Sequence, residues 1–242
     1  PSQVADEFQS LLSQGIDVLH LCDAEYNQPR SHAYAVCAEL NRRSLGDKIR
    51  WYTYMSPSPF DAELAEAMAR AGCVGIDFTG DSACESVLRT YRQQHRKENL
   101  AEAVRLCRAN GIAVMIDLLL GGPGETPQTI RETIDFMKKI DPDCAGAALG
   151  MRVYPGTAME QMVAEESREG KDGNIRRKYT GPIDLLKPTF YISKALGERP
   201  AELVRDIIDG DERFFEPAVE VAEDDGAANY NYNENLPLTQ AI

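Results

Sequence analysis

The chain has 242 residues, 43% of them apolar, and a formal net charge of −13 at pH 7. This length and apolar content predict one large globular domain, or a domain with an appendage. The acidic balance excludes a nucleic-acid backbone as a partner, because such binding needs a basic face. The sequence has no run of about 18 apolar residues and so predicts no membrane-spanning helix.

The thiols and imidazoles of the sequence form no motif of their own. The six cysteines, at positions 22, 37, 73, 84, 107 and 144, follow no CxxC or CxxxC spacing. Scattered thiols of this kind are typical of the cores of cytoplasmic proteins, although a metal site built from distant cysteines stays open. We expect His20 to lie in a strand and His95, in the charged run RQQHRKEN, to be solvated.

The elements follow one another in a regular alternation. The chain begins at Pro1, with no Met, inside a predicted helix that Gly15 ends, so we expect a piece of a longer protein. Apolar or aromatic strands are predicted to begin near residues 17, 49, 73, 112 and 144, each preceded by an amphipathic helix. The last of them is predicted to run without a break over residues 144–154. A period of about 25 to 40 residues is typical of consecutive right-handed βα units.

Open doubly wound sheets and closed barrels both fit this period. The regular alternation, without an obvious switch point, favours a partial (βα)6 barrel of the TIM type with a C-terminal α/β appendage. In both architectures, ligands bind at the carboxyl ends of the strands. The residues at those ends are therefore the candidate site.

The stretch IAVMIDLLLGGPGET, residues 112–126, is the most informative of these strand ends. It reads as a buried strand that carries Asp117 in its middle, where an unpaired charge is costly. The glycines at 121, 122 and 124 leave bare backbone that a ligand can approach. Thr126 and Pro127 are suited to the N-cap and first turn of the next helix. A strand-to-helix turn with no ligand is the alternative reading.

Polar side chains gather at the other predicted strand ends as well. The candidate site residues are Asp23, Glu25, Thr53, Asp77, Thr79, Asp81, Ser82, Asp117, Leu119, Gly121, Gly122, Arg152 and Tyr154. Aspartate is rare inside strands, so Asp77 and Asp117 carry the most information. The alternative is that each aspartate pairs with a neighbour such as Arg152 or caps a loop amide. The sequence identifies no catalytic residue and no set of metal ligands.

The alternation of strands and helices ends after Thr157. We expect one domain over residues 1–168, and an appendage with an acidic and polar tail over residues 169–242. From Glu216 the composition predicts a loosely ordered tail. Phe190, Tyr191, Phe214 and Phe215 are expected to anchor the appendage by packing.

Four motifs occur in the same order in a known enzyme family. They are DAEYN at 23–27, AGCVGIDFTGDS at 71–82, LLLGGPGET at 118–126 and GMRVYPGT at 150–157. Together they resemble the catalytic barrel of radical S-adenosylmethionine enzymes, and within these the branch that carries a cobalamin-binding domain ahead of the barrel. The resemblance covers roughly residues 1–195.

The resemblance implies an incomplete six-stranded barrel and two cofactors. In this family a CxxxCxxC loop holds a four-iron four-sulfur cluster, and electron transfer from the cluster splits S-adenosylmethionine to a 5′-deoxyadenosyl radical. This sequence has no CxxxCxxC, so we expect the first strand and the cluster ligands to lie upstream of Pro1. Natural loss of the motif is the alternative, and use of cobalamin by the parent protein stays open.

The resemblance also assigns parts of the candidate site. Asp23 to Glu25 would lie near the methionine amino group of S-adenosylmethionine. Thr79, Asp81 and Ser82 would face its ribose or carboxylate. Leu119 and Gly121, with the backbone near Val153 and Tyr154, would flank the adenine. An apolar slot with close backbone and a few fixed polar groups suits an adenosyl moiety.

The resemblance implies a radical enzyme that carries out a methylation or related transformation of an unknown small-molecule or peptide substrate in the cytoplasm. Its partners would include an electron donor such as flavodoxin or ferredoxin, and neither nucleic acid nor a membrane. The fragment by itself would be inactive without the cluster loop. The alternatives are a metal-dependent βα-barrel lyase or aldolase, and a catalytically inactive barrel scaffold.

Overall fold

The structure, a computed structural model, describes residues 1–168 and 189–217. Its largest part is a six-stranded sheet in the order β1-β2-β3-β4-β5-β8, in which every pair of neighbours is parallel. The strands are β1 Val18–Leu21, β2 Arg50–Met55, β3 Cys73–Asp81, β4 Ala113–Leu120, β5 Cys144–Leu149 and β8 Phe214–Phe215.

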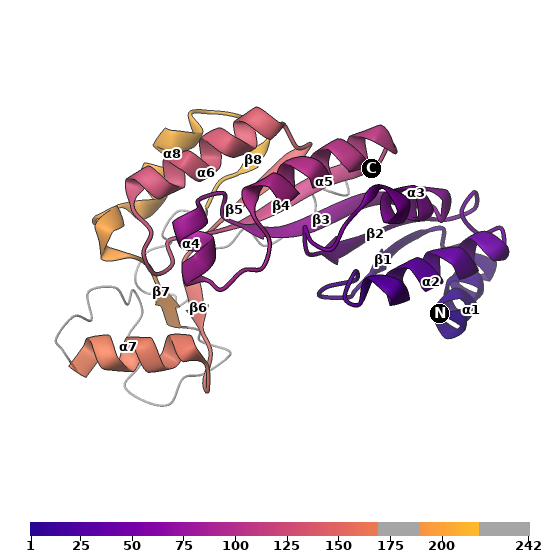
Figure 1. The fold of residues 1–242 in the computed structure, drawn as a ribbon, viewed down its shortest axis with the longest axis horizontal. Helices are drawn as coiled ribbons and strands as arrows, with labels where there is room; N and C mark the ends of the chain where they lie inside the picture. The colour runs from indigo at the N-terminus through magenta and orange to yellow at the C-terminus, as the bar shows by residue number, and fades with distance from the viewer. Residues whose placement is uncertain (169–188, 218–242) are drawn as a thin grey trace.

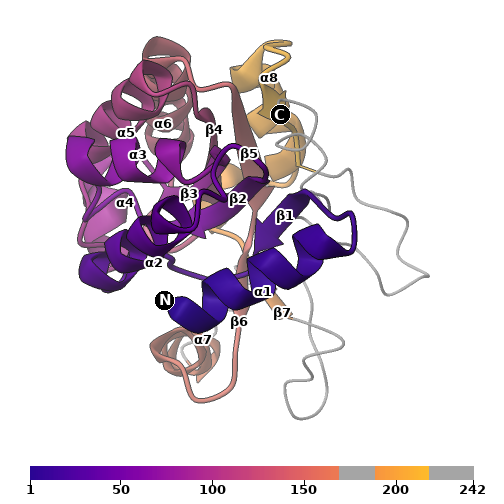
Figure 2. The same ribbon diagram turned by 90° about the vertical axis from the view of Figure 1, so that its right-hand side faces the viewer.

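Helices connect these strands and cover one side of the sheet (Figures 1 and 2). They are α1 Ser2–Ser13, α2 Arg30–Arg42, α3 Ala62–Arg70, α4 Glu85–Thr90, α5 Lys97–Ala109, α6 Pro127–Ile140 and α8 Pro200–Ile208. Parallel strands that follow the chain order, each joined by a helix, confirm the predicted partial barrel. No helix within residues 1–168 and 189–217 has the length and apolar character of a membrane span.

Side-chain caps set the starts of two of these helices. Asp61 accepts a hydrogen bond from the Leu64 amide across 2.9 Å and caps α3. Thr126 and Thr129 form a reciprocal capping box at the start of α6, with Pro127 in the first turn. The predicted start of this helix is therefore confirmed.

The two faces of the sheet differ in what they contact. Ile76, Phe78 and Ile116 are fully buried in the main core with the apolar sides of the helices. Because side chains alternate along a strand, Asp77, Thr79 and Asp117 point to the other face. Met115 and Cys144 on that face form a small separate cluster with Tyr52 and Phe215. We call this face the lumen face, since it is the concave interior of a barrel.

The last predicted strand, residues 144–154, is divided in two. Gly150 has φ +94°, which ends β5 at Leu149. The chain then forms β6, Met151–Val153, which leaves the sheet and pairs antiparallel with β7, Thr189–Tyr191. Figure 1 shows β6, β7 and α7, Ala158–Arg168, projecting beyond the carboxyl ends of the sheet. The prediction of one continuous strand was wrong because it missed this turn.

The sixth strand of the sheet comes from late in the chain. Phe214 and Phe215 pair with Ala145 and Gly146 of β5, and α8 packs beside α6. The boundary between residues 168 and 169 stays a prediction, and the tail predicted to be loosely ordered lies outside the described residues from residue 218 onward.

Candidate functional site

The carboxyl half of the lumen face is acidic. Register pairs Thr79 with Asp117, and Asp77 with Met115, so the two aspartates lie diagonally across the β3–β4 pair. Asp77 is 1% exposed, and neither of its carboxylate oxygens has a hydrogen-bond partner. Asp117 is half-buried, and its Oδ1 is likewise unpartnered. Burial raises the pKa of both carboxyls, and the charge of each acidic neighbour raises it further.

Glu25 and Thr79 come together from separate strand ends. The Thr79 hydroxyl donates to Glu25 Oε1 across 3.0 Å, which leaves Glu25 Oε2 buried without a partner. Burial raises the pKa of Glu25, the hydrogen bond from Thr79 opposes that shift, and the charge of Asp81 adds to it. Glu25, Thr79 and Asp81 therefore belong to one polar group at the strand ends.

A bulge at the end of β3 sets the position of Asp81. The register shifts between Thr79 and Asp81, and Asp81 has φ +53°. The Gln93 side-chain amide donates to Asp81 Oδ2, while burial raises the pKa of Asp81 to about 6. Behind the bulge, the His95 ring nitrogen Nε2 lies 3.0 Å from Gly80 O. His95 is 3% exposed, so the expectation that it is solvated was wrong.

The glycine turn after β4 is held by a buried glutamate. The Gly121 amide donates to Glu125 Oε2, and the Ser193 hydroxyl donates to Glu125 O across 2.7 Å. The Ser193 amide donates in turn to Gly121 O across 2.7 Å. Glu125 is fully buried, and burial raises its pKa to about 8. The turn is thus fixed from inside. Gly121 and Gly122 are buried, and Gly122 is covered by the Tyr91 ring, so the expectation that both leave bare backbone for a ligand was wrong.

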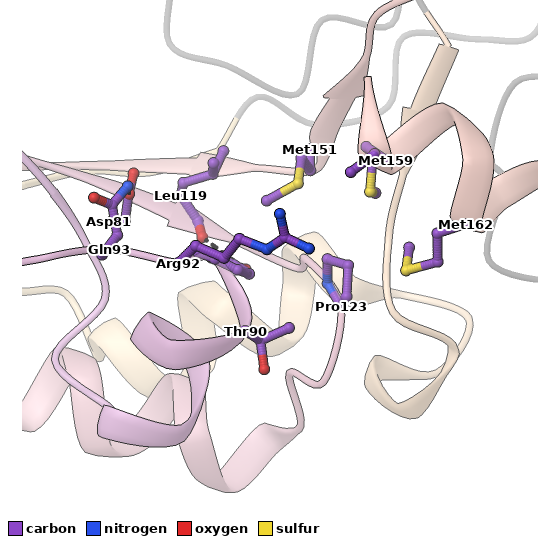
Figure 3. A pocket seen from close by; sticks show the side chains of 11 residues that line it. Asp81, Thr90, Arg92, Gln93, Leu119, Pro123, Met151, Met159 and Met162 are labelled. Carbon is purple, nitrogen blue, oxygen red and sulfur yellow. Dashed lines mark hydrogen bonds between the residues drawn. The ribbon is translucent and has the colours of Figure 1, made fainter. Parts of the chain in front are cut away.

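A cavity of about 390 Å³ adjoins this turn. Figure 3 shows Asp81 and Gln93 on one side, the three methionines on the other, and the Arg92 side chain reaching in between. Its apolar walls come from Leu119 on β4, from Pro123 of the turn and from Met151 on β6. The lining residues are Asp81, Thr90, Tyr91, Arg92, Gln93, Leu119, Pro123, Met151, Ala158, Met159 and Met162. Such a volume is usual for a ligand pocket, where about 300 to 1,000 Å³ is typical.

Several sequence-predicted residues lie away from this cavity. Thr53 is buried on the helix-facing side of β2, where its hydroxyl donates to Leu21 O across 3.0 Å. Ser82 is also buried, and its hydroxyl lies 2.9 Å from the Thr133 hydroxyl of α6. Strand alternation and the bulge at Gly80 turn these two side chains away from the lumen, so we do not carry them into the site.

Asp23, Arg152 and Tyr154 do not line the cavity either. Asp23 is exposed, and its carboxylate accepts the Glu25 amide of its own loop at 3.4 Å. Arg152 lies over the rings of Tyr154 and Phe190, at 6.0 and 5.5 Å. Tyr154 is 44% exposed. Arg152 forms no ion pair with Asp77 or Asp117 in the described structure, against one alternative reading of the sequence.

Sequence reasoning missed several residues of the site. Gln93 lies in a charged run that reads as solvated, and Met159 and Met162 lie on α7 at ordinary helical spacing. Glu125 could have been predicted from the sequence, because it lies within the GGPGET motif. The other residues become visible only once the turn after α4 and the start of α7 are placed beside β4.

Comparison with known proteins identifies the family of the chain and several relatives. The sequence matches the family described as the Radical SAM superfamily over residues 1–137, more than half of the chain. It is 34% identical over 175 residues to tryptophan 2-C-methyltransferase of Streptomyces laurentii, covering 67% of this chain and 29% of that enzyme. It is 27% identical over 218 residues to the anaerobic magnesium-protoporphyrin IX monomethyl ester cyclase of Cereibacter sphaeroides, covering 89% and 34%.

Solved structures agree with the sequence matches. The structure of the radical S-adenosylmethionine methyltransferase TsrM from Kitasatospora setae, with tryptophan substrate and the analogue aza-SAM bound, matches with a TM-score of 0.81. The two are 28% identical, and the match covers 99% of this chain and 52% of that one. This chain therefore spans about half of TsrM and about a third of the two sequence relatives. With the family match and the partial barrel together, the chain belongs to the radical S-adenosylmethionine superfamily.

Proposed function

We propose that this chain is the S-adenosylmethionine-binding core of a radical enzyme that methylates, or similarly transforms, an organic substrate. The observation that carries the proposal is the cavity of about 390 Å³ between the glycine turn, the turn after α4 and α7. It combines residues of the AGCVGIDFTGDS, LLLGGPGET and GMRVYPGT motifs in one place. The similarity of the chain to the methyltransferase TsrM supports the same activity.

The lining of this cavity suits an adenosyl group. Leu119, Pro123 and Met151 offer the apolar surface that an adenine ring needs. Asp81, held by the Gln93 amide, is an acceptor for hydroxyl groups such as those of a ribose. Gly122, buried beside Pro123, lets the Tyr91 ring pack against the turn, and Tyr91 lines the same space. We propose these residues as the adenosyl site.

Glu25 extends the proposed site toward the methionine part of S-adenosylmethionine. Its Oε2 is buried without a partner, while Oε1 is held by Thr79. A carboxylate oxygen fixed in this way accepts hydrogen bonds from an ammonium group. The charge of Asp81 acts on Glu25, which supports a single continuous site for the two.

The iron-sulfur cluster needs ligands that this sequence does not supply. It has no CxxxCxxC spacing, and among the described residues no group of three His, Cys, Asp or Glu side chains could hold a metal ion. When bound, the cluster of this family supplies the electron that cleaves S-adenosylmethionine. The proposal also includes an iron-sulfur cluster held by another segment, cobalamin, an electron donor of the flavodoxin or ferredoxin type, and a cytoplasmic location.

The two alternative functions fit the structure less well. A lyase or aldolase of the βα-barrel class would have a closed eight-stranded barrel, whereas the described residues form a six-stranded sheet with β1 and β8 at its edges. An inactive scaffold predicts a collapsed cleft at the strand ends. The cavity beside the glycine turn opposes that reading.

The test is binding of 5′-methylthioadenosine, which carries the adenosine part of S-adenosylmethionine without the amino and carboxylate groups that chelate the cluster iron in this family. Isothermal titration calorimetry should give saturable binding, weakened at least ten-fold by Asp81→Asn. Asparagine tolerates the positive φ of residue 81, so the backbone is preserved. Asp135→Asn, the same change at an exposed position of α6, is the matched control and should bind as the wild type does. A folded chain without saturable binding would overturn the proposed function.

A further inference from the structure

The unpartnered carboxylates of Asp77 and Asp117 have no role in the adenosyl site described above. Neither lines the cavity beside the glycine turn. Leu119, two residues beyond Asp117 on the same face of β4, does line it. Asp117 therefore lies one layer of side chains below Leu119 on the lumen face, and Asp77, the register partner of Met115, lies one layer below Asp117.

A buried carboxylate without hydrogen bonds is destabilising unless a ligand or a proton satisfies it. Three oxygens of this pair lack partners: both of Asp77 and Oδ1 of Asp117. Within the described part of the chain, no lysine, arginine or histidine side chain is paired with either residue. Asp117 is half-buried and so partly open to solvent, whereas Asp77 is fully buried beside it. These unpartnered oxygens are the feature that a positively charged ligand would satisfy.

An aromatic wall stands beside the pair on the same face. His20 stacks on Tyr52 with ring centroids 4.3 Å apart, and meets Tyr54 edge-on at 5.0 Å. Tyr54 is the register partner of Asp77 on the adjacent strand. Burial lowers the pKa of His20, so its imidazole is neutral near pH 7 and does not act as the missing cation. Aromatic faces next to carboxylates are a combination that binds organic cations.

We propose that Asp77 and Asp117 bind the positively charged nitrogen of the substrate, which is an organic amine with an aromatic or apolar body. The body lies against His20, Tyr52 and Tyr54, and the ammonium group donates to the unpartnered carboxylate oxygens. This inference rests on the proposed function, because it takes the adjoining cavity as the cosubstrate site. It places the substrate next to the proposed S-adenosylmethionine site.

The probe is tryptamine, compared with its neutral counterpart tryptophol, in which a hydroxyl replaces the ammonium group. Calorimetric titration of the wild-type chain should show tryptamine binding at least ten-fold tighter than tryptophol. The Asp77→Asn/Asp117→Asn double variant should lose that ten-fold preference and bind tryptophol as before. Asparagine keeps the shape and removes the charge, so a merely structural role would not produce this selective loss. Asp135→Asn again serves as the control.

Three results would overturn the inference. They are equal affinity of the wild type for the two probes, unchanged tryptamine binding by the double variant, and loss of 5′-methylthioadenosine binding in the double variant. The last would place the aspartates in the adenosyl site instead. Failure of tryptamine alone, with 5′-methylthioadenosine still bound, refutes only the substrate class. Failure of 5′-methylthioadenosine in the wild type refutes the proposed function.

Discussion

The phenol of Tyr91 lies so close to Gly122 that a Cβ on residue 122 would stand 2.1 Å from the phenol oxygen. The Tyr91 hydroxyl also donates to Leu119 O across 3.3 Å. Tyr91 and Leu119 both line the cavity. Glycine at position 122 thus permits a ring-to-backbone contact that fixes one wall of the proposed adenosyl site.

Gly122→Ala should therefore displace Tyr91 and destabilise the fold. Forcing a methyl group into a filled space costs about 1 to 3 kcal/mol. The variant should also bind 5′-methylthioadenosine more weakly, because the ring forms part of the cavity wall. Urea denaturation gives the change in unfolding free energy, and calorimetry gives the change in affinity.

The control for this contact is to make Gly122→Ala in a Tyr91→Ala variant and to measure the unfolding free energy again. Without the ring, the added methyl group has nothing to meet, so the cost of Gly122→Ala should fall close to zero in a double-mutant cycle. A cost that persists in the Tyr91→Ala background would show that backbone conformation, rather than the ring, requires glycine at this position.

Glu125 should make the stability of the chain fall as pH rises. Its pKa is raised from 4.5 to about 8 in the folded state. Between these values the unfolded chain has lost the proton that the folded chain keeps, so folding is favoured at the acidic end. The slope from this group is about 1.4 kcal/mol per pH unit. Urea denaturation at pH 5, 6, 7 and 8 measures it.

Glu125→Gln removes the titrating group and still offers an oxygen to the Gly121 amide. The unfolding free energy of the variant relative to the wild type should therefore increase from pH 5 to pH 8. Asp77 and Asp117 titrate in both proteins, so their contribution cancels in the difference. Parallel stability profiles of the two proteins would show that Glu125 is ionised in the folded state.

Ser82→Ala should weaken the fold without affecting the proposed adenosyl site. The Ser82 hydroxyl accepts the Cys84 amide across 3.1 Å and contacts the Thr133 hydroxyl. Removing it leaves buried polar groups unsatisfied, at a cost of about 1 to 3 kcal/mol. Affinity for 5′-methylthioadenosine should stay within two-fold of the wild type, in contrast with Asp81→Asn.

Ser31→Ala, at an exposed position on α2, is the control for this serine substitution. Its unfolding free energy should change by less than about 0.5 kcal/mol. A ten-fold loss of 5′-methylthioadenosine affinity in Ser82→Ala, with stability unchanged, would place Ser82 in contact with the cosubstrate and restore the prediction made from the resemblance.

The sequence by itself determined the elements of the barrel and the chemistry of its open end. Apolar runs and helix stops located β1 to β5 because burial of one face imposes a fixed spacing on each element. Asp77 and Asp117 stood out because charges inside strands are costly. The resemblance carried by four ordered motifs indicated the family, which the comparisons confirmed.

Only the tertiary structure decided which of these side chains meet. Thr53 and Ser82 share the polar character of Thr79 and Asp81, yet strand alternation and the bulge at Gly80 bury them against other elements. The sixth strand, Phe214–Phe215, joins β5 across nearly 70 residues of sequence. Gln93 and Met159 reach the cavity from distant segments in the same way. Such contacts depend on long-range packing, which local periodicity does not encode.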